Sequence, residues 1–168
     1  MKTFIGLFLV VLAVVGIGFF LFTSSKAPNP ADLPGQLFDD LGGEHIADGS
    51  KDHPAYNSNP PTSGWHWPAP AEWGVYDPPE ADERYIHNLE HGGIWITYKP
   101  STVSAEDQAK LKDFSKRWRK IIVTPREAND SNIALAAWTR LQQLDSYDEN
   151  TIIRFIEAFY DQGPEKVP

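Results

Sequence analysis

The sequence that decides the fold is residues 86–100, IHNLEHGGIWITYKP. Its second part, Ile94–Tyr98, is β-branched and aromatic, a composition typical of a strand. Its first part carries His87 and His91 four residues apart, a spacing that brings both side chains to one face of a helical turn. Residues 92–93 are both glycine. They would end the turn and lead directly into the strand.

Further regular elements are expected towards the C-terminus. Ser104 and Asp107 resemble a capping box with Asp in the glutamate position, so a helix should follow. A second strand is predicted at residues 120–124. Residues 133–139 fit either a buried strand or a helical face, and we favour the strand. Residues 146–149 form another capping box, which predicts a last amphipathic helix. This mixture predicts an α+β domain with a short sheet and packed helices.

Towards the N-terminus the pattern changes. Residues 37–86 contain many turn signals and few periodic stretches, and they hold half of the prolines and three of the six tryptophans. An irregular segment of this length inside a domain is uncommon, and it is often functional when ordered. Residues 24–36 are rich in Pro, Ser and Ala and are predicted to be an extended linker. The domain itself is predicted to span residues 37–168.

The first 23 residues are predicted to form a transmembrane anchor. Residues 3–22 carry no charged side chain, and twenty residues of helix rise about 30 Å, enough to cross the hydrocarbon core. A cleaved signal peptide and a buried soluble helix are the alternatives. An anchor or a signal would place residues 37–168 on the extracytoplasmic side of the cell membrane, and an anchor would make the membrane itself a partner through residues 3–22.

Composition excludes several classes of function. The formal net charge is −8 and the isoelectric point is near 5.0, with no basic run. A nucleic-acid partner is therefore not expected, because such domains usually present a basic surface to the phosphates. The chain has no cysteine, which excludes thiol catalysis and zinc–thiolate sites.

The histidines are concentrated in one part of the sequence. All five lie at or before residue 91, in or beside the irregular half: His45, His53, His66, His87 and His91. Glycines precede His45, and tryptophans flank His66. The plain interpretation is that these are packed polar side chains; the alternative is that several of them share a metal ion.

Five stretches resemble a known bacterial family. They are residues 42–46 (GGEHI), 56–67 (YNSNPPTSGWHW), 74–79 (GVYDPP), 86–100, and the C-terminal stretch from LAAWTRLQQ to QGPE. The family is domain of unknown function 3105, and the likeness extends over about residues 40–166. It implies a membrane-tethered extracytoplasmic domain without an established activity. It also assigns His45, His66, His87 and His91 to the family pattern, leaves His53 outside it, and makes Trp65 a departure where a proline is expected.

These four histidines predict a metal site. Imidazoles without a nearby thiolate or thioether suit a borderline divalent cation, so zinc or copper is the expected cofactor. Glu90, Glu44 or a water could complete the coordination.

Two other functions remain open. Residues 87–91 match the H-x-x-E-H pattern of certain zinc peptidases, in which Glu90 would be the general base. The glycines that follow at once, and the absence of histidine downstream, argue against this metal-dependent hydrolase. The second alternative is a non-catalytic module that binds a protein or the cell envelope through Trp65, Trp67 and Trp73.

Overall fold

The central strand is β3 (Ile94–Tyr98), in which every residue is buried. A computed structural model describes residues 32–166 of the chain. β4 (Ile121–Pro125) pairs with β3 in parallel, and β5 (Ile133–Ala137) pairs with it antiparallel on the other side. A strand that is covered on both faces reads as a continuous apolar run, which explains why IWITY, IIVTP and IALAA lack alternation.

Three further strands complete a six-stranded mixed sheet in the order β1-β6-β5-β3-β4-β2. β6 (Arg140–Leu144) forms a hairpin with β5, and β1 (Gln36–Leu37) pairs with β6 at one edge. β2 (Gly74–Val75) pairs in parallel with β4 at the other edge. β2, β3 and β4 are therefore mutually parallel, so their carboxyl ends lie at one edge of the sheet. The short edge strands and β6 carry little sequence signal and were not predicted.

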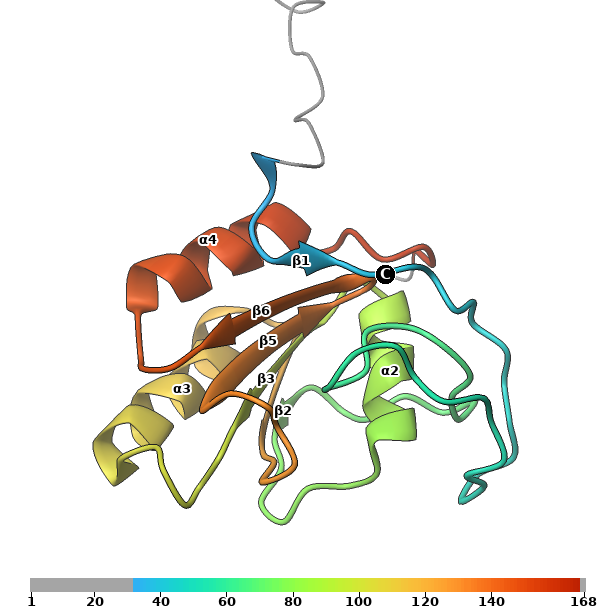
Figure 1. Ribbon diagram of the computed structural model, residues 1–168, viewed down its shortest axis with the longest axis horizontal. Helices are drawn as coiled ribbons and strands as arrows, with labels where there is room; N and C mark the ends of the chain where they lie inside the picture. The colour runs from blue at the N-terminus through green and yellow to red at the C-terminus, as the bar shows by residue number, and fades with distance from the viewer. Residues whose placement is uncertain (1–31, 167–168) are drawn as a thin grey trace, which may run out of the picture. The chain divides into compact units, whose positions relative to one another are not determined.

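Helices cover both faces of the sheet (Figure 1). α3 (Ala105–Arg117) and α4 (Glu149–Phe159) lie on one face, and α2 (Asp82–Glu90) lies on the other with the irregular segment around it. On the α2 face, Tyr85 and Leu89 pack with Trp95 and Ile122 in one apolar cluster. Burial of this cluster fixes the position of α2 relative to the sheet.

α2 ends as the glycine pair predicted. His91 caps the helix, and Gly92 has a positive φ of 78°. The amide of Gly92 donates to Leu89 O and that of Gly93 to Asn88 O, at 2.9 and 2.8 Å. These two bonds form a Schellman motif, which satisfies carbonyls at the helix end. The chain then turns directly into β3, so the end of α2 is held beside the centre of the sheet.

The predicted start of α3 is confirmed, and that of α4 needs a correction. Ser104 caps α3 by accepting a hydrogen bond from the amide of Asp107. The cap of α4 is Asp148 rather than residue 146, because the Asp148 carboxylate accepts from the amide and hydroxyl of Thr151. Residues 133–137 form a strand, as favoured, whereas the irregular stretch 37–86 ends earlier than predicted, at the start of α2.

The predicted fold class with a transmembrane helix is corrected. No helix among residues 32–166 is long and apolar enough to cross a membrane. The predicted span, residues 3–22, lies outside the described residues. What is observed is an α+β unit that begins at Pro34, with six strands and three helices in the described part of the chain.

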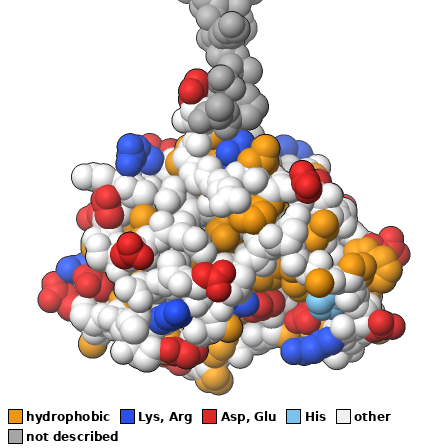
Figure 2. All heavy atoms as spheres, in the orientation of Figure 1, with side chains coloured by type: hydrophobic (Ala, Val, Ile, Leu, Met, Phe, Trp, Pro, Cys, Tyr) orange, Lys and Arg blue, Asp and Glu red, His pale blue; other side chains and the backbone are white. Residues whose placement is uncertain are grey.

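The surface of this unit is mixed in character. On the face shown in Figure 2, acidic and basic side chains are interspersed with apolar ones, and little histidine reaches the surface. The small histidine area agrees with the burial of His66 and His87, which are 0% and 5% exposed. His66 and His87 therefore lie in the interior of the unit, whereas His45 is exposed.

Candidate functional site

Two loop segments and α2 bring three histidines together. His45 and His66 face each other across a short parallel bridge, in which the amide of Ile46 donates to His66 O and the amide of His66 to Glu44 O. The next amide, that of Trp67, donates to the carbonyl of Glu83 in α2 at 3.1 Å. These backbone bonds join the two loop segments to each other and to α2, whose last turn carries His87.

The three imidazoles form a compact triangle. The ring centroids of His45, His66 and His87 are 5.0 Å apart in each pair. With Glu90 they form a group in which one ligand atom from each residue lies within 4.8 Å of the others. His66 and His87 are buried, Glu90 is partly buried, and His45 is exposed. Nitrogen and carboxylate oxygen atoms at this spacing can converge on one metal ion.

His66 presents one ring nitrogen to this group. Its Nδ1 lies 2.8 Å from the carbonyl oxygen of Gly64. Because a carbonyl only accepts, Nδ1 carries the proton and Nε2 has the lone pair. That Nε2 lies 3.1 Å from Oε2 of Glu90 and has no hydrogen-bond donor among the described residues. Two acceptors therefore face each other in a buried place, unless a proton or a metal cation lies between them.

His87 is oriented in the same way. Its Nδ1 lies 2.8 Å from the carbonyl oxygen of Trp67, so its Nε2 also points a lone pair inwards. That Nε2 is 3.1 Å from Nε2 of His91, which is in turn 2.9 Å from Oε2 of Glu165. His87, His91 and Glu165 form a second group of possible ligands. His87 belongs to both groups but has only one ring nitrogen left to offer.

The surroundings keep the two buried imidazoles neutral. Burial lowers the pKa of His66 to about 4, with smaller contributions from the neighbouring histidines. Burial also lowers the pKa of His87 and raises that of Glu90. Removal from water disfavours the charged form of each group. Neutral imidazole is the form that binds a metal, so both histidines are in the binding state at pH 7.

A second layer of contacts fixes the ligands. The Asn88 side chain donates to Ala71 O and accepts from its amide, both at 2.8 Å, which ties the Trp-rich loop to α2. Gly43 lies against the carboxylate of Glu90, and a side chain at position 43 would collide with Oε1. The Trp138 ring stands edge-on to His66, with the centroids 6.4 Å apart. The site is therefore enclosed by the loops and by the β5–β6 turn.

Most of the predicted site residues meet, in a changed grouping. His45, His66 and His87 come together, and His91 lies next to them in the second group. Glu90, considered only as a base or an auxiliary ligand, lies among them. Glu165 was missed, because nothing in the local sequence after the last helix indicates a return to α2.

Other residues that the sequence singled out lie elsewhere. Glu44 is exposed and belongs to neither group. His53 is stacked on Tyr56 and contacts Glu83, away from the cluster. Of the three tryptophans considered for a docking face, only Trp65 is exposed; Trp67 and Trp73 are partly buried.

Residues 49–168 match the model of the family described as Protein of unknown function (DUF3105). The match covers more than two thirds of the chain. The chain belongs to this family. No match was found among curated proteins or among solved structures.

The DUF3105 match divides the candidate ligands. His66, His87, Glu90, His91 and Glu165 lie inside the matched residues, whereas His45 lies before the first of them. The two buried ligands, His66 and His87, are thus within the family match, and His45 is in the segment that precedes it.

Proposed function

We propose that the chain binds one divalent transition metal ion, zinc or copper, through His45, His66, His87 and Glu90. The observation that carries this proposal is the pair formed by His66 Nε2 and Glu90 Oε2. These acceptors face each other at 3.1 Å, while the only proton of the neutral His66 ring is given to Gly64. A metal ion bonded to both atoms at about 2.0–2.2 Å removes this conflict.

A proton on Glu90 would be the simplest substitute for the ion. Burial raises the pKa of that carboxyl, which favours such a proton in the metal-free protein. Metal binding then displaces it, as is usual for sites whose ligands must lose protons. The second oriented imidazole, His87, supports a metal further, because its Nδ1 is bonded to Trp67 O and a ligand atom of this residue lies within 4.8 Å of those of His45, His66 and Glu90.

The donor set selects the class of metal. Three imidazoles and a carboxylate suit zinc or divalent copper. Cuprous ion prefers thiolate or thioether ligands, and the chain has no cysteine and only one methionine, Met1. His45 is the exposed member of the group, so the ion would enter and leave on its side.

His45, His66, His87 and Glu90 are a better set than the trio of His87, His91 and Glu165. The trio depends on the Glu165 side chain, which is 59% exposed. Because Nδ1 of His87 is bonded to Trp67 O, one ion at a time can use this residue. Glu90 acts in this account as a ligand, and no separate observation favours a hydrolase.

Metal content of the purified full chain tests the proposal. We expect about one equivalent of zinc or copper by inductively coupled plasma mass spectrometry after incubation with either ion and desalting. His66→Gln should lose it, whereas Glu165→Gln and the matched histidine control His53→Gln should retain it. Absence of bound metal in the parent chain, or equal retention in His66→Gln, would refute the proposal.

A further inference from the structure

A separate cavity of about 650 Å³ lies at the carboxyl ends of the three parallel strands. Its walls come from the segment after β2, the start of α2, the ends of β3 and β4, and the loop that carries His53. None of the four proposed metal ligands lines it. In sheets with parallel strands, ligands bind in the crevice outside the carboxyl ends, and the volume is that of a small-molecule site.

The walls of this cavity are largely apolar. Three aromatic residues line it, Tyr56, Trp95 and Tyr98, together with four prolines, Pro78, Pro79, Pro100 and Pro125. The Trp95 indole is fixed by donating to Thr124 Oγ1 at 2.9 Å. Proline and packed aromatic side chains change shape little, so the cavity is largely preformed for a compact apolar body.

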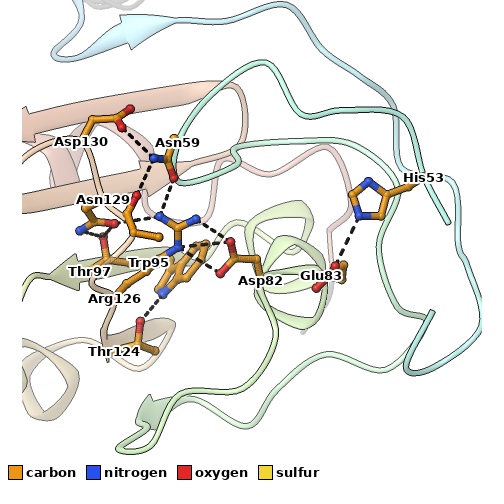
Figure 3. A network of polar contacts seen from close by, with 11 residues as sticks. His53, Asn59, Asp82, Glu83, Trp95, Thr97, Thr124, Arg126, Asn129 and Asp130 are labelled. Carbon is orange, nitrogen blue, oxygen red and sulfur yellow. Dashed lines mark hydrogen bonds and ion pairs between the residues drawn. The ribbon is translucent and has the colours of Figure 1, made fainter. Parts of the chain in front are cut away.

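The charges around the cavity are mainly negative. Five carboxylates line it, Asp77, Glu80, Asp82, Glu83 and Glu127, against two cations, Lys51 and Arg126. Arg126 is already engaged: its guanidinium donates to both oxygens of Asp82 and to Asn59 and Asn129 (Figure 3). Asp82 thereby neutralises Arg126, and Glu80 and Asp77 pair with Arg84 and Lys112, which are outside the lining. Glu83 and Glu127 then face one lining lysine, Lys51, so the remaining charge of the cavity is negative.

Glu83 is the deepest of these carboxylates. Its side chain is 6% exposed, and among residues 32–166 its carboxylate has one polar contact, with His53 at 3.4 Å (Figure 3). A carboxylate held this far from water gains much from a second, better placed donor. The aromatic rings that line the same cavity also attract a cation through their faces.

We propose that this cavity binds a small organic cation, an amine with an apolar body, whose charged end pairs with Glu83. The apolar part lies against the aromatic and proline walls. This inference is independent of the metal site, because no atom of the proposed ligand group lines the cavity.

Calorimetric titration of the full chain with three probes of one shape tests this. Phenethylamine, 2-phenylethanol and phenylacetate share an aromatic body and differ in charge. We expect phenethylamine to bind at least tenfold more tightly than phenylacetate, with the alcohol between them. The highest phenethylamine concentration in the titration is about 10 mM, near the dissociation constant of the weakest binding that matters here. Comparable affinity for phenylacetate, or no heat of binding from phenethylamine up to that concentration, would overturn the proposal.

Variants locate the binding. Glu83→Gln should weaken phenethylamine binding about tenfold, the scale of one charge-assisted hydrogen bond, and leave the alcohol unchanged. Ala81→Trp should fill the cavity and abolish binding of both. Glu106→Gln, on an exposed carboxylate outside the cavity, should bind like the parent. Unchanged binding by Ala81→Trp with a parental unfolding temperature would contradict the assignment.

Discussion

The His66 imidazole is the most constrained side chain of the site. It has no exposed surface, one nitrogen is bonded to Gly64 O, and the other faces Glu90. Three features hold the ring in this position: the turn that precedes His66, the packing of Trp138 and the position of α2. Substitutions at the neighbours of Glu90 should therefore affect the site without affecting the fold.

Gly43→Ala is the sharpest of these substitutions. A methyl group at position 43 would collide with the Glu90 carboxylate, which must then move away from His66. We expect zinc affinity to fall about 10–100-fold, the usual range for a residue that orients a ligand, with little change in unfolding free energy. Gly49→Ala is the control. A Cβ added at position 49 would contact no other atom, but the φ of +81° is unfavourable for alanine. This variant should lose unfolding free energy and keep the parental zinc affinity. Parental affinity in Gly43→Ala would contradict the role of Glu90.

The metal-free chain should lose stability on acidification. The pKa of His66 is lowered to about 4, so between pH 6.5 and about 4 the unfolded chain takes up a proton that the folded chain excludes. This corresponds to at most about 3 kcal/mol of unfolding free energy at the acid end. His87 acts in the same direction and Glu90, with its raised pKa, in the opposite one.

Urea unfolding with EDTA at pH 7.5, 5.5 and 4.5 measures this dependence. His66→Gln should show a shallower loss of stability than the parent over that range, because the residue that excludes the proton is gone. An identical slope in the two proteins would show that His66 is not held neutral by the fold.

At the scale of elements, α2 connects the site with the sheet. Its Tyr85 and Leu89 belong to the apolar cluster, while His87 and Glu90 face the loop histidines. The sequence predicted the end of this helix, because two glycines followed by a β-branched run have one simple interpretation. It did not predict the start, since Ala81 provides no side-chain cap and only acidic residues mark the first turn.

α4, by contrast, should contribute stability alone. Phe155 is fully buried beside Phe159, so Phe155→Ala should lower the unfolding free energy by about 3–5 kcal/mol. Bound metal per folded chain should not change. Leu37→Ala, at a residue that is 56% exposed, is expected to stay within about 0.5 kcal/mol of the parent. A loss of metal in folded Phe155→Ala would show that α4 supports the site directly.

At the scale of the whole molecule, the sequence predicted the α+β class and the three buried strands well. Short edge strands such as β1 and β2 were not predicted, because a strand of two residues has no periodic pattern. The meeting of His45, His66 and His87 was predicted from residue type and from the family resemblance, not from spacing. The regrouping of His91 with Glu165 depends on how the C-terminal segment returns to α2, where the Glu165 amide donates to Glu90 O, and no local signal encodes that contact.

Anomalous diffraction at the zinc edge from crystals of the full chain grown with zinc is the most direct test of the central claim. The account predicts one peak at about 2.0–2.2 Å from Nε2 of His66 and of His87 and from a carboxylate oxygen of Glu90. The peak should vanish in data collected below the edge. A peak held by His91 and Glu165 without His66, or no peak among these residues, would contradict it.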